Sequence, residues 1–469
     1  MEEYFDYNSP ESLTASVERY EEMLRKSDSY FFDVSVFEDL INYYMDKNDP
    51  VKALQAISHA KEQHSYIGVF DIKQAQLEMT LGKHNKALKS LEHAEILDPS
   101  NEDLHILKGA IFDKLERYDE AIASFNLALD GAEFPDDVYL SLAYVYQNKG
   151  DYEKAIKCLK KCLSIDLNNQ HVLYEIAFCY EVLDKVEESV GFYQRFINED
   201  PYSYAGWYNL GNAQHQLEQY DKALDAYDYA ILIKEDFASA YYNKGNTLMC
   251  LERFAEAILC FKTTFEYEQP VAETYCNIGD CYEKLGMTDE ARKNFKKAIK
   301  LNPDLGESWN GVGATLQDED RFYESIHFFK EALKRDDKNG DFWRNIADSY
   351  FELGKIKEAK KAFEKATYFE PEEADHWLAY SNLLFTENQF SDAIAMIMQG
   401  IKTLPDDISL QFRLAAYHFA MGNGPAGFEQ LETALEKNPD SIELLFDYLP
   451  QLQENKLIVS LINKFSDKG

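Results

Sequence analysis

The chain has 469 residues, of which 45% are hydrophobic and 28% are charged, and it contains only 12 prolines. This composition provides enough apolar surface for a core and few residues that interrupt helices, so most of the chain is expected to fold. Its 84 acidic residues against 48 basic ones give a formal net charge of −36, which argues against nucleic acid and anionic membranes as partners because both attract cations.

Two interpretations of the acidic charge stay open. Excess carboxylates can keep a long, open molecule from associating with itself, or they can create a preference for basic partners. The acidic residues are scattered along the chain instead of forming one run, which favours the first interpretation.

The sequence shows no signal for export or membrane insertion. The first residues, Met1 to Asp6, contain neither a basic stretch nor an apolar one, and no run of about 18 apolar residues occurs. The seven cysteines are odd in number and lack a C-x-x-C pair, which is typical of reduced thiols. We therefore expect no membrane contact and a cytoplasmic location.

The first predicted element is a helix over residues 9–26, and after it the sequence repeats with a period of 34 residues. Twelve repeats run without a gap from Val34 to Ser441. The repeats begin at residues 34, 68, 102, 136, 170, 204, 238, 272, 306, 340, 374 and 408.

The flanks of the repeats are short. Helices are expected over residues 442–449 and 456–465, and they are separated by Pro450. An open stack of repeats leaves an apolar face at each end, so residues 1–33 and 442–469 are expected to cap the stack formed by residues 34–441. Neither flank is long enough for a second domain of ordinary size, which argues against enzymatic activity.

Small residues recur at the eighth and twentieth positions of the repeats. Of these 24 positions, 23 are Gly, Ala or Ser, as in Gly279 and Ala291. Small side chains let two antiparallel helices approach closely. Each repeat is therefore predicted to be a helical hairpin with these positions at the contact between its two helices.

Large residues occupy two further positions. The twenty-fourth residue is large and mainly apolar in all twelve repeats. The fourth position holds every tryptophan of the chain, and this regularity predicts that they lie in the core. These tryptophans are Trp207, Trp309, Trp343 and Trp377.

The pattern W-x2-L-G-x2-Y, followed by A-x3-F-x2-A and P, resembles the tetratricopeptide repeat. Residues 272–305 match it at every slot, with Tyr for Trp and Ile for Leu, through Tyr275, Ile278, Gly279, Tyr282, Ala291, Phe295, Ala298 and Pro303. The resemblance covers residues 34–441. It implies an all-α fold, a right-handed superhelical solenoid of stacked helix-turn-helix repeats with an inner and an outer surface.

The resemblance also implies that the first helix of each repeat lines a concave groove. Amides can donate to and accept from any peptide backbone, and tyrosines add apolar area with a hydroxyl group. Alternatively, the amides satisfy neighbouring backbone groups and the tyrosines pack between repeats. The predicted groove residues are Tyr174, Tyr208, Asn209, Asn212, Tyr242, Asn243, Asn246, Asn277, Asp280, Asn345 and Asp348.

A carboxylate clamp, with which some members of the family grip chaperone C-termini, lacks its cations in this sequence. Asn212 and Asn243 stand where clamp amides would, but Tyr208 and Glu273 replace the expected lysines. An acidic stripe at the second position of four repeats favours a basic or neutral ligand instead. This stripe consists of Glu273, Glu307, Asp341 and Asp375.

Catalytic and metal-binding motifs are missing. No H-x-x-x-H or H-E-x-x-H spacing occurs, and neither does a phosphate-binding glycine motif. Cys158 and Cys162 are one helical turn apart, but Cys162 falls on a small packing position, which favours burial over metal binding. The sequence therefore predicts no enzyme activity, no cofactor and no metal.

The leading functional hypothesis is a cytoplasmic scaffold or adaptor that binds an extended peptide segment of a partner protein in its groove. A regulatory receptor, whose solenoid responds to a short peptide or small ligand, is the alternative, because each repeat contacts only its neighbours and the stack can change its dimensions. Small-angle scattering with and without candidate ligands would separate the two.

Overall fold

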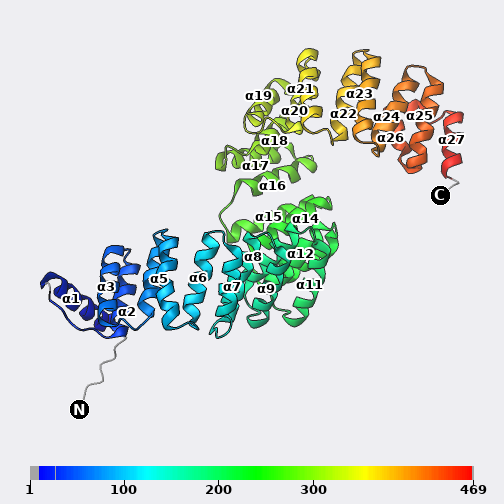
Figure 1. Ribbon diagram of the computed structural model, residues 1–469. Helices are drawn as coiled ribbons and strands as arrows, with labels where there is room; N and C mark the ends of the chain where they lie inside the picture. Colours follow the sequence, from blue (N-terminus) through cyan, green and yellow to red (C-terminus); the bar gives the residue numbers. More distant parts are fainter. Residues whose placement is uncertain (1–9, 27, 467–469) are drawn as a thin grey trace. The chain divides into compact units, whose positions relative to one another are not determined.

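The computed structural model describes residues 10–26 and 28–466, and these form α-helices that follow one another in antiparallel pairs (Figure 1). Within these residues there are 27 α-helices, two short 3-10 helices and no β-strand. The fold is therefore an all-α solenoid. None of the described helices is both long and apolar enough to cross a bilayer.

The chain divides into two compact bodies, Met1–Glu235 and Asp236–Gly469, which we call the N-terminal and the C-terminal body. The N-terminal body contains α1 Pro10–Lys26, α2 Val34–Asp46, α3 Pro50–Gln63, α4 Val69–Thr80, α5 His84–Leu97, α6 Glu102–Lys114, α7 Tyr118–Ala128, α8 Pro135–Asn148, α9 Tyr152–Ile165, α10 Gln170–Val182, α11 Val186–Glu199, α12 Tyr204–Gln216 and α13 Tyr220–Ile233.

The C-terminal body continues the same order of paired helices. It contains α14 Ala238–Cys250, α15 Phe254–Tyr267, α16 Ala272–Lys284, α17 Thr288–Leu301, α18 Gly306–Gln317, α19 Phe322–Leu333, α20 Gly340–Glu352, α21 Ile356–Phe369, α22 Ala374–Thr386, α23 Phe390–Thr403, α24 Ile408–Ala420, α25 Gly424–Lys437, η1 Pro439–Ile442, α26 Glu443–Tyr448, η2 Pro450–Leu452 and α27 Lys456–Ser466.

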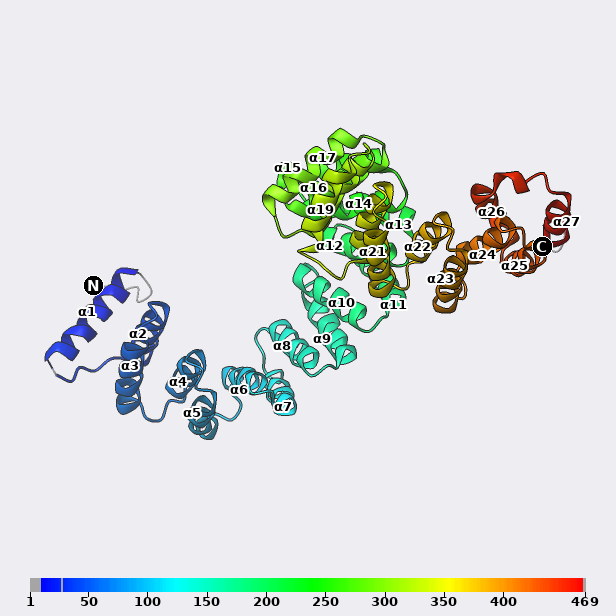
Figure 2. The same ribbon diagram turned by 90° about the horizontal axis from the view of Figure 1, so that it is seen from above.

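The even-numbered helices from α2 to α24 each begin within one residue of a predicted repeat start, and the odd-numbered helices from α3 to α25 complete the hairpins. Each second helix lies beside its own first helix, as α4 and α5 or α6 and α7 show (Figure 2). Consecutive first helices are also in contact, for example α16 with α18. The first helices of each body therefore form one continuous layer.

The turn inside each hairpin depends on one residue with a left-handed backbone. The fifteenth residue has a positive φ in all twelve repeats, and five of these residues are glycines, such as Gly286 with φ 71°. The other seven carry side chains, and Glu252 has φ 57°. A left-handed residue at this point ends the first helix and turns the chain back along it.

The contact between the two helices of a hairpin pairs a small residue with a large one. A Cβ atom on Gly279 would lie 2.6 Å from the ring of Phe295, a distance that leaves no room for it. Position 8 is glycine in five repeats, and in all five the facing residue at position 24 is Phe or Tyr. The small positions that the sequence predicts at the hairpin contact are confirmed there.

The tryptophans differ from the prediction that they lie in the core. Trp377 is 3% exposed, but Trp207, Trp309 and Trp343 are only half-buried. A side chain from the second helix of the same repeat lies against each of these three rings, namely Tyr229, Phe328 and Lys365. Tyr229 stacks on Trp207 with ring centroids 4.4 Å apart, for example.

The flanking helices cover the first and the last repeat. Val17, Tyr20 and Met23 of α1 are buried against α2 and α3. At the other end, Ile458 of α27 is fully buried in a cluster with Leu431 of α25. The predicted helix over residues 9–26 is observed from Pro10, whereas residue 9 lies outside the described residues.

Candidate peptide-binding surface

Side-chain amides connect neighbouring first helices in the C-terminal body. Asn277 of α16 donates through Nδ2 to Tyr242 Oη and Asn246 Oδ1 of α14, at 3.2 and 3.0 Å. Asn345 of α20 donates through Nδ2 to Asn310 Oδ1 of α18 at 3.0 Å. Asn277 and Asn345 therefore join neighbouring repeats through side-chain hydrogen bonds, whereas the alternative interpretation expected bonds to backbone groups.

These amides keep hydrogen-bonding capacity for a ligand. Asn277 and Asn345 are half-buried, and the Oδ1 atom of each has no hydrogen-bond partner among the described residues. An amide oxygen is an acceptor for backbone N–H groups. The two carbonyls therefore offer fixed acceptors, one on α16 and one on α20.

Carboxyl groups with raised pKa values lie on the same helices. Burial, together with Glu283 and Glu307, raises the pKa of Asp280 to about 7, although Lys284 partly opposes this. Burial and the nearby Asp318 also raise the pKa of Glu283. Asp280 and Glu283 form no ion pair among the described residues, and the nearby Lys284 only partly offsets the repulsion between carboxylates.

A carboxyl group with a raised pKa also lies two repeats further on, in α20. Burial raises the pKa of Asp348 on α20 to about 6, and Glu352 adds to this rise. Arg344 opposes it, but its Nε atom is 3.9 Å from Asp348 Oδ2, at the outer limit of an ion pair. The carboxyl groups of α16 and α20 are therefore held in positions where a further cation would be favourable.

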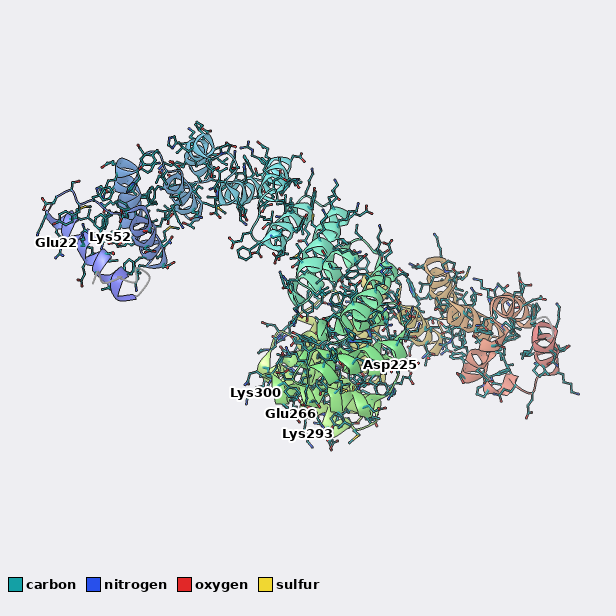
Figure 3. All side chains as sticks on the ribbon, turned by 90° about the horizontal axis from the view of Figure 1, so that it is seen from below. Glu22, Lys52, Asp225, Glu266, Lys293 and Lys300 are labelled. Atoms are coloured by element: carbon teal, nitrogen blue, oxygen red, sulfur yellow. The ribbon has the colours of Figure 1, made fainter. Side chains whose placement is uncertain are left out.

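The cations of this body lie mainly on second helices. Lys293 and Lys300 of α17 are exposed side chains, and they lie on the same side of the view in Figure 3 as the exposed Glu266 of α15. The stripe of Glu273, Glu307, Asp341 and Asp375 is exposed on the first helices. The first-helix layer from α14 to α22 is thus predominantly acidic and little neutralised by the chain itself.

The predicted residues of the N-terminal body have a different environment. The rings of Tyr174 on α10 and Tyr208 on α12 meet edge to face with centroids 6.2 Å apart. Asn209 is 2% exposed, and its Nδ2 atom is buried without a hydrogen-bond partner. Asn212 accepts a hydrogen bond of 2.8 Å from Tyr227 Oη on α13. Tyr174 is 36% exposed, whereas Tyr208 and Asn212 are half-buried.

Two exposed apolar residues on α10 were missed by sequence reasoning. Phe178 is 48% exposed and Val182 is 46% exposed, and they follow Tyr174 at successive turns of the helix. They occupy the ninth and thirteenth positions of their repeat, which are groove positions in the family. The ninth position of other repeats holds polar residues, and the prediction was therefore limited to polar side chains there.

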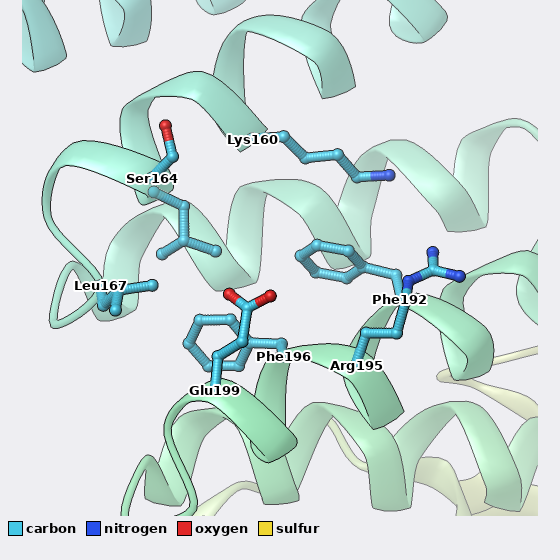
Figure 4. A pocket seen from close by; sticks show the side chains of 8 residues that line it. Lys160, Ser164, Leu167, Phe192, Arg195, Phe196 and Glu199 are labelled. Atoms are coloured by element: carbon cyan, nitrogen blue, oxygen red, sulfur yellow. The ribbon is translucent and has the colours of Figure 1, made fainter.

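A pocket of about 250 Å³ opens elsewhere in the N-terminal body, between α9 and α11 (Figure 4). Phe192, Phe196 and Leu163 form its mostly buried floor, and Lys160 and Arg195 lie at its edge. It is formed by second helices, so it does not belong to the first-helix layer. Its volume suits a single side chain and not an extended segment.

Profiles of the tetratricopeptide repeat match most of the chain. They match residues 72–138, 136–169, 171–203, 204–237, 238–268, 272–305 and 316–383. The chain belongs to the tetratricopeptide repeat family. These repeats make it a scaffold for protein interactions, in a family that is generally not enzymatic.

A short part of this chain is similar to a curated protein. Cell division cycle protein 27 homolog A from Arabidopsis thaliana is 34% identical over 71 residues, which are 15% of this chain and 10% of that protein. The chain therefore matches only a tenth of the length of this curated relative.

Three solved structures are similar to parts of this chain. MamA is 28% identical, with 36% of this chain and 92% of MamA covered and a TM-score of 0.32. YrrB, described as a TPR protein with an unusual peptide-binding site, is 24% identical over 40% of this chain and 95% of its own, with a TM-score of 0.33. The APC/C hetero-tetramer Cut9–Hcn1 is 12% identical over 90% and 99%, with a TM-score of 0.44.

Proposed function

We propose that this scaffold binds an extended, basic peptide segment of a partner protein along the first helices α14, α16, α18 and α20. The observation that carries this proposal is the group of carboxyl side chains on that layer, above all Asp280, whose pKa is raised to about 7 although Lys284 partly opposes the rise. A lysine or arginine of a partner would relieve the repulsion and restore the ordinary ionisation of the group.

The amides would supply the part of recognition that does not depend on sequence. Asn277 and Asn345 hold their free carbonyl oxygens on α16 and α20, where backbone N–H groups of an extended chain can donate to them. Adjacent helices pack about 10 Å apart, so four first helices span about 30 Å. A segment of roughly ten extended residues covers that distance.

The tyrosines of the N-terminal body extend the proposal. Tyr174 and Tyr208, with the missed Phe178, offer an aromatic surface on α10 and α12. We propose that apolar side chains of a partner contact them. Asn209 and Asn212 would then hold the surrounding helices in place, because one is buried and the other is bound to Tyr227.

The remaining predictions stay part of the proposal. We assign residues 34–441 to twelve repeats in a right-handed superhelix and residues 1–33 and 442–469 to its caps. The seven cysteines are free thiols, which supports a cytoplasmic location because that compartment keeps thiols reduced.

Fluorescence anisotropy with a labelled peptide of about twelve residues that alternates Lys with Ser tests the proposal. The variant Asp280→Asn with Glu283→Gln should weaken its binding about tenfold, since it removes two half-buried carboxylates of the proposed peptide-binding surface. The control variant Glu266→Gln with Asp289→Asn removes the same charge from exposed positions on α15 and α17. It should bind like the wild type.

The outcomes separate recognition from general attraction. A peptide with Glu in place of Lys should not bind detectably to either protein. Equal weakening in both double variants would show that the net charge of the chain attracts the peptide, and the proposed surface would then be wrong. The substitution Asn277→Ala, compared with Asn294→Ala on the second helix α17, tests the amides in the same assay.

A further inference from the structure

Three side chains from the tenth and eleventh repeats lie close together, apart from the amides Asn277 and Asn345. They are Asp341 at the start of α20, Glu370 directly after α21, and His376 on α22, and one ligand atom of each lies within 4.8 Å of the others. We propose that they form a binding site for a divalent cation of the zinc class. Asp341 also belongs to the exposed acidic stripe of the first-helix layer, but the metal site is argued from different observations than peptide binding.

The distance between the two inner groups fits a shared metal ion. His376 Nε2 is 3.3 Å from Glu370 Oε2. A charge-assisted hydrogen bond between such groups is usually about 2.7–2.9 Å long. Bonds of about 2.0–2.1 Å from a tetrahedral zinc ion place two of its ligand atoms roughly 3.3 Å apart. The pair is therefore spaced like two neighbouring zinc ligands.

Gly340 leaves the room that the two ligand atoms need. A Cβ atom at this position would lie 2.7 Å from both His376 Nε2 and Glu370 Oε2. The backbone N–H of Gly340 also donates to Glu370 Oε1 at 2.8 Å. This bond holds the carboxylate in orientation, as outer hydrogen bonds do for metal ligands.

The proposed site is buried on the side of His376 and open to solvent on the side of Asp341. His376 is fully buried, and its Nδ1 atom has no hydrogen-bond partner. The imidazole therefore faces the site through Nε2, the atom that would bind the metal. Glu370 is partly exposed and Asp341 is exposed, so an ion can enter from solvent and keep a water ligand.

The ligand types favour zinc over calcium or magnesium. One imidazole nitrogen with two carboxylates suits zinc, whereas calcium and magnesium prefer sites built from oxygen alone. The acidic surroundings attract any divalent cation to this part of the surface. A bound ion would join the two repeats, because α20 belongs to one and α22 to the next.

Calorimetric titration of zinc chloride into the full-length protein tests the site, after removal of metals with a chelator and in the presence of a phosphine reductant. Asp341→Asn removes the exposed ligand without disturbing the buried pair. Asp375→Asn, next to His376 and also exposed, removes the same charge without removing a ligand. The first variant should lose one binding event or weaken it about tenfold or more, and the second should match the wild type.

A second readout excludes the seven cysteines as the source of binding. Cobalt(II) should give absorption in the visible range without the near-ultraviolet band of thiolate ligation, and this signal should be reduced in Asp341→Asn and in Glu370→Gln. Zinc binding that is equal in Asp341→Asn and the wild type would overturn the proposal. A thiolate band that accounts for all bound cobalt would overturn it as well.

Discussion

The indole N–H of Trp343 donates a hydrogen bond of 2.8 Å to the backbone carbonyl of Asp337, six residues earlier. The acceptor is the thirty-second residue of one repeat, and the donor is the fourth residue of the next. The same bond recurs wherever the fourth residue has an indole or amide N–H. It joins Trp207 to Pro201, Trp309 to Pro303, Trp377 to Pro371 and Gln411 to Pro405.

Trp343→Phe should lower the free energy of unfolding by about 1–2 kcal/mol. It removes one hydrogen bond and part of the ring that Lys365 covers, with Nζ 3.8 Å from the ring centroid. Tyr275→Phe is the matched control, because Tyr275 occupies the same slot and its hydroxyl has no partner among the described residues. Urea unfolding followed by circular dichroism should show the loss in the first variant and almost none in the second. Equal losses would contradict the role of the hydrogen bond.

Gly279→Ala should destabilise the C-terminal body by about 1–3 kcal/mol, because the new methyl group would overlap the ring of Phe295. Adding Phe295→Leu should recover part of the loss. That double variant reproduces the pair found naturally at Ala143 and Leu159. Thermal unfolding of both variants measures the recovery.

The same change at an open position gives the control for this packing argument. Gly191 lies within α11, and a Cβ atom there would meet nothing within 4 Å. Gly191→Ala should therefore stabilise the protein by about 0.5–1 kcal/mol through its better helix propensity. If both alanines destabilised the protein alike, the close contact with Phe295 would not be the cause.

Glu252→Gly should stabilise the protein by about 0.5–1 kcal/mol, although it removes a side chain. Glu252 has φ 57°, a conformation that costs a residue with a Cβ atom about 1–2 kcal/mol and glycine little. Lys293→Gly, at an exposed position inside α17, should instead cost about 1 kcal/mol. Urea unfolding measures both variants. If neither variant were more stable than the wild type, or if both were, the role given to the left-handed residue would be wrong.

Much of the fold could be predicted because it repeats. The small residue at Gly279 and the large one at Phe295 mark a helix contact that recurs in every hairpin, so composition at fixed positions was enough. The left-handed turn was less visible, since only five of its twelve residues are glycine. The burial of Trp309 was overestimated, because the slot lies at the edge of a repeat, where its neighbour covers only part of the ring.

The candidate sites depend on contacts between repeats, and these are harder to predict. Asn277 meets Asn246 across 31 residues, a distance close to the repeat length, so the family pattern indicated both residues. Asp341, Glu370 and His376 have no local spacing that signals a metal. They come together only because the end of one repeat packs against the start of the next.

The raised pKa of Asp280 predicts how stability changes with pH. Between about pH 4 and pH 7 the folded protein keeps a proton on this group that the unfolded chain has lost. The free energy of unfolding should therefore fall as pH rises through this range. Asp280→Asn should remove the effect and stabilise the protein at pH 8 by about 1–2 kcal/mol, a value reduced because the carboxyl is half-buried.

Near pH 4 the variant and the wild type should differ little, because the folded wild type is then protonated at this position. Unfolding curves in urea at both pH values check this. A variant less stable than the wild type at pH 8 would show that the carboxylate is favourably paired in the folded protein, contrary to the environment described above.

The central claim is that a cation of the partner lies against Asp280, and the affinity for the labelled Lys–Ser peptide at pH 6 and pH 8 tests it most directly. A lysine of the peptide binds better to ionised Asp280 than to the protonated form. At pH 6 most Asp280 carries a proton, and the loss of this proton on binding lowers the affinity. We predict that the wild type binds several-fold more tightly at pH 8 and that Asp280→Asn binds more weakly, with an affinity that changes little between the two pH values. A wild-type affinity that is the same at both values, or an equal rise in the variant, would contradict the account.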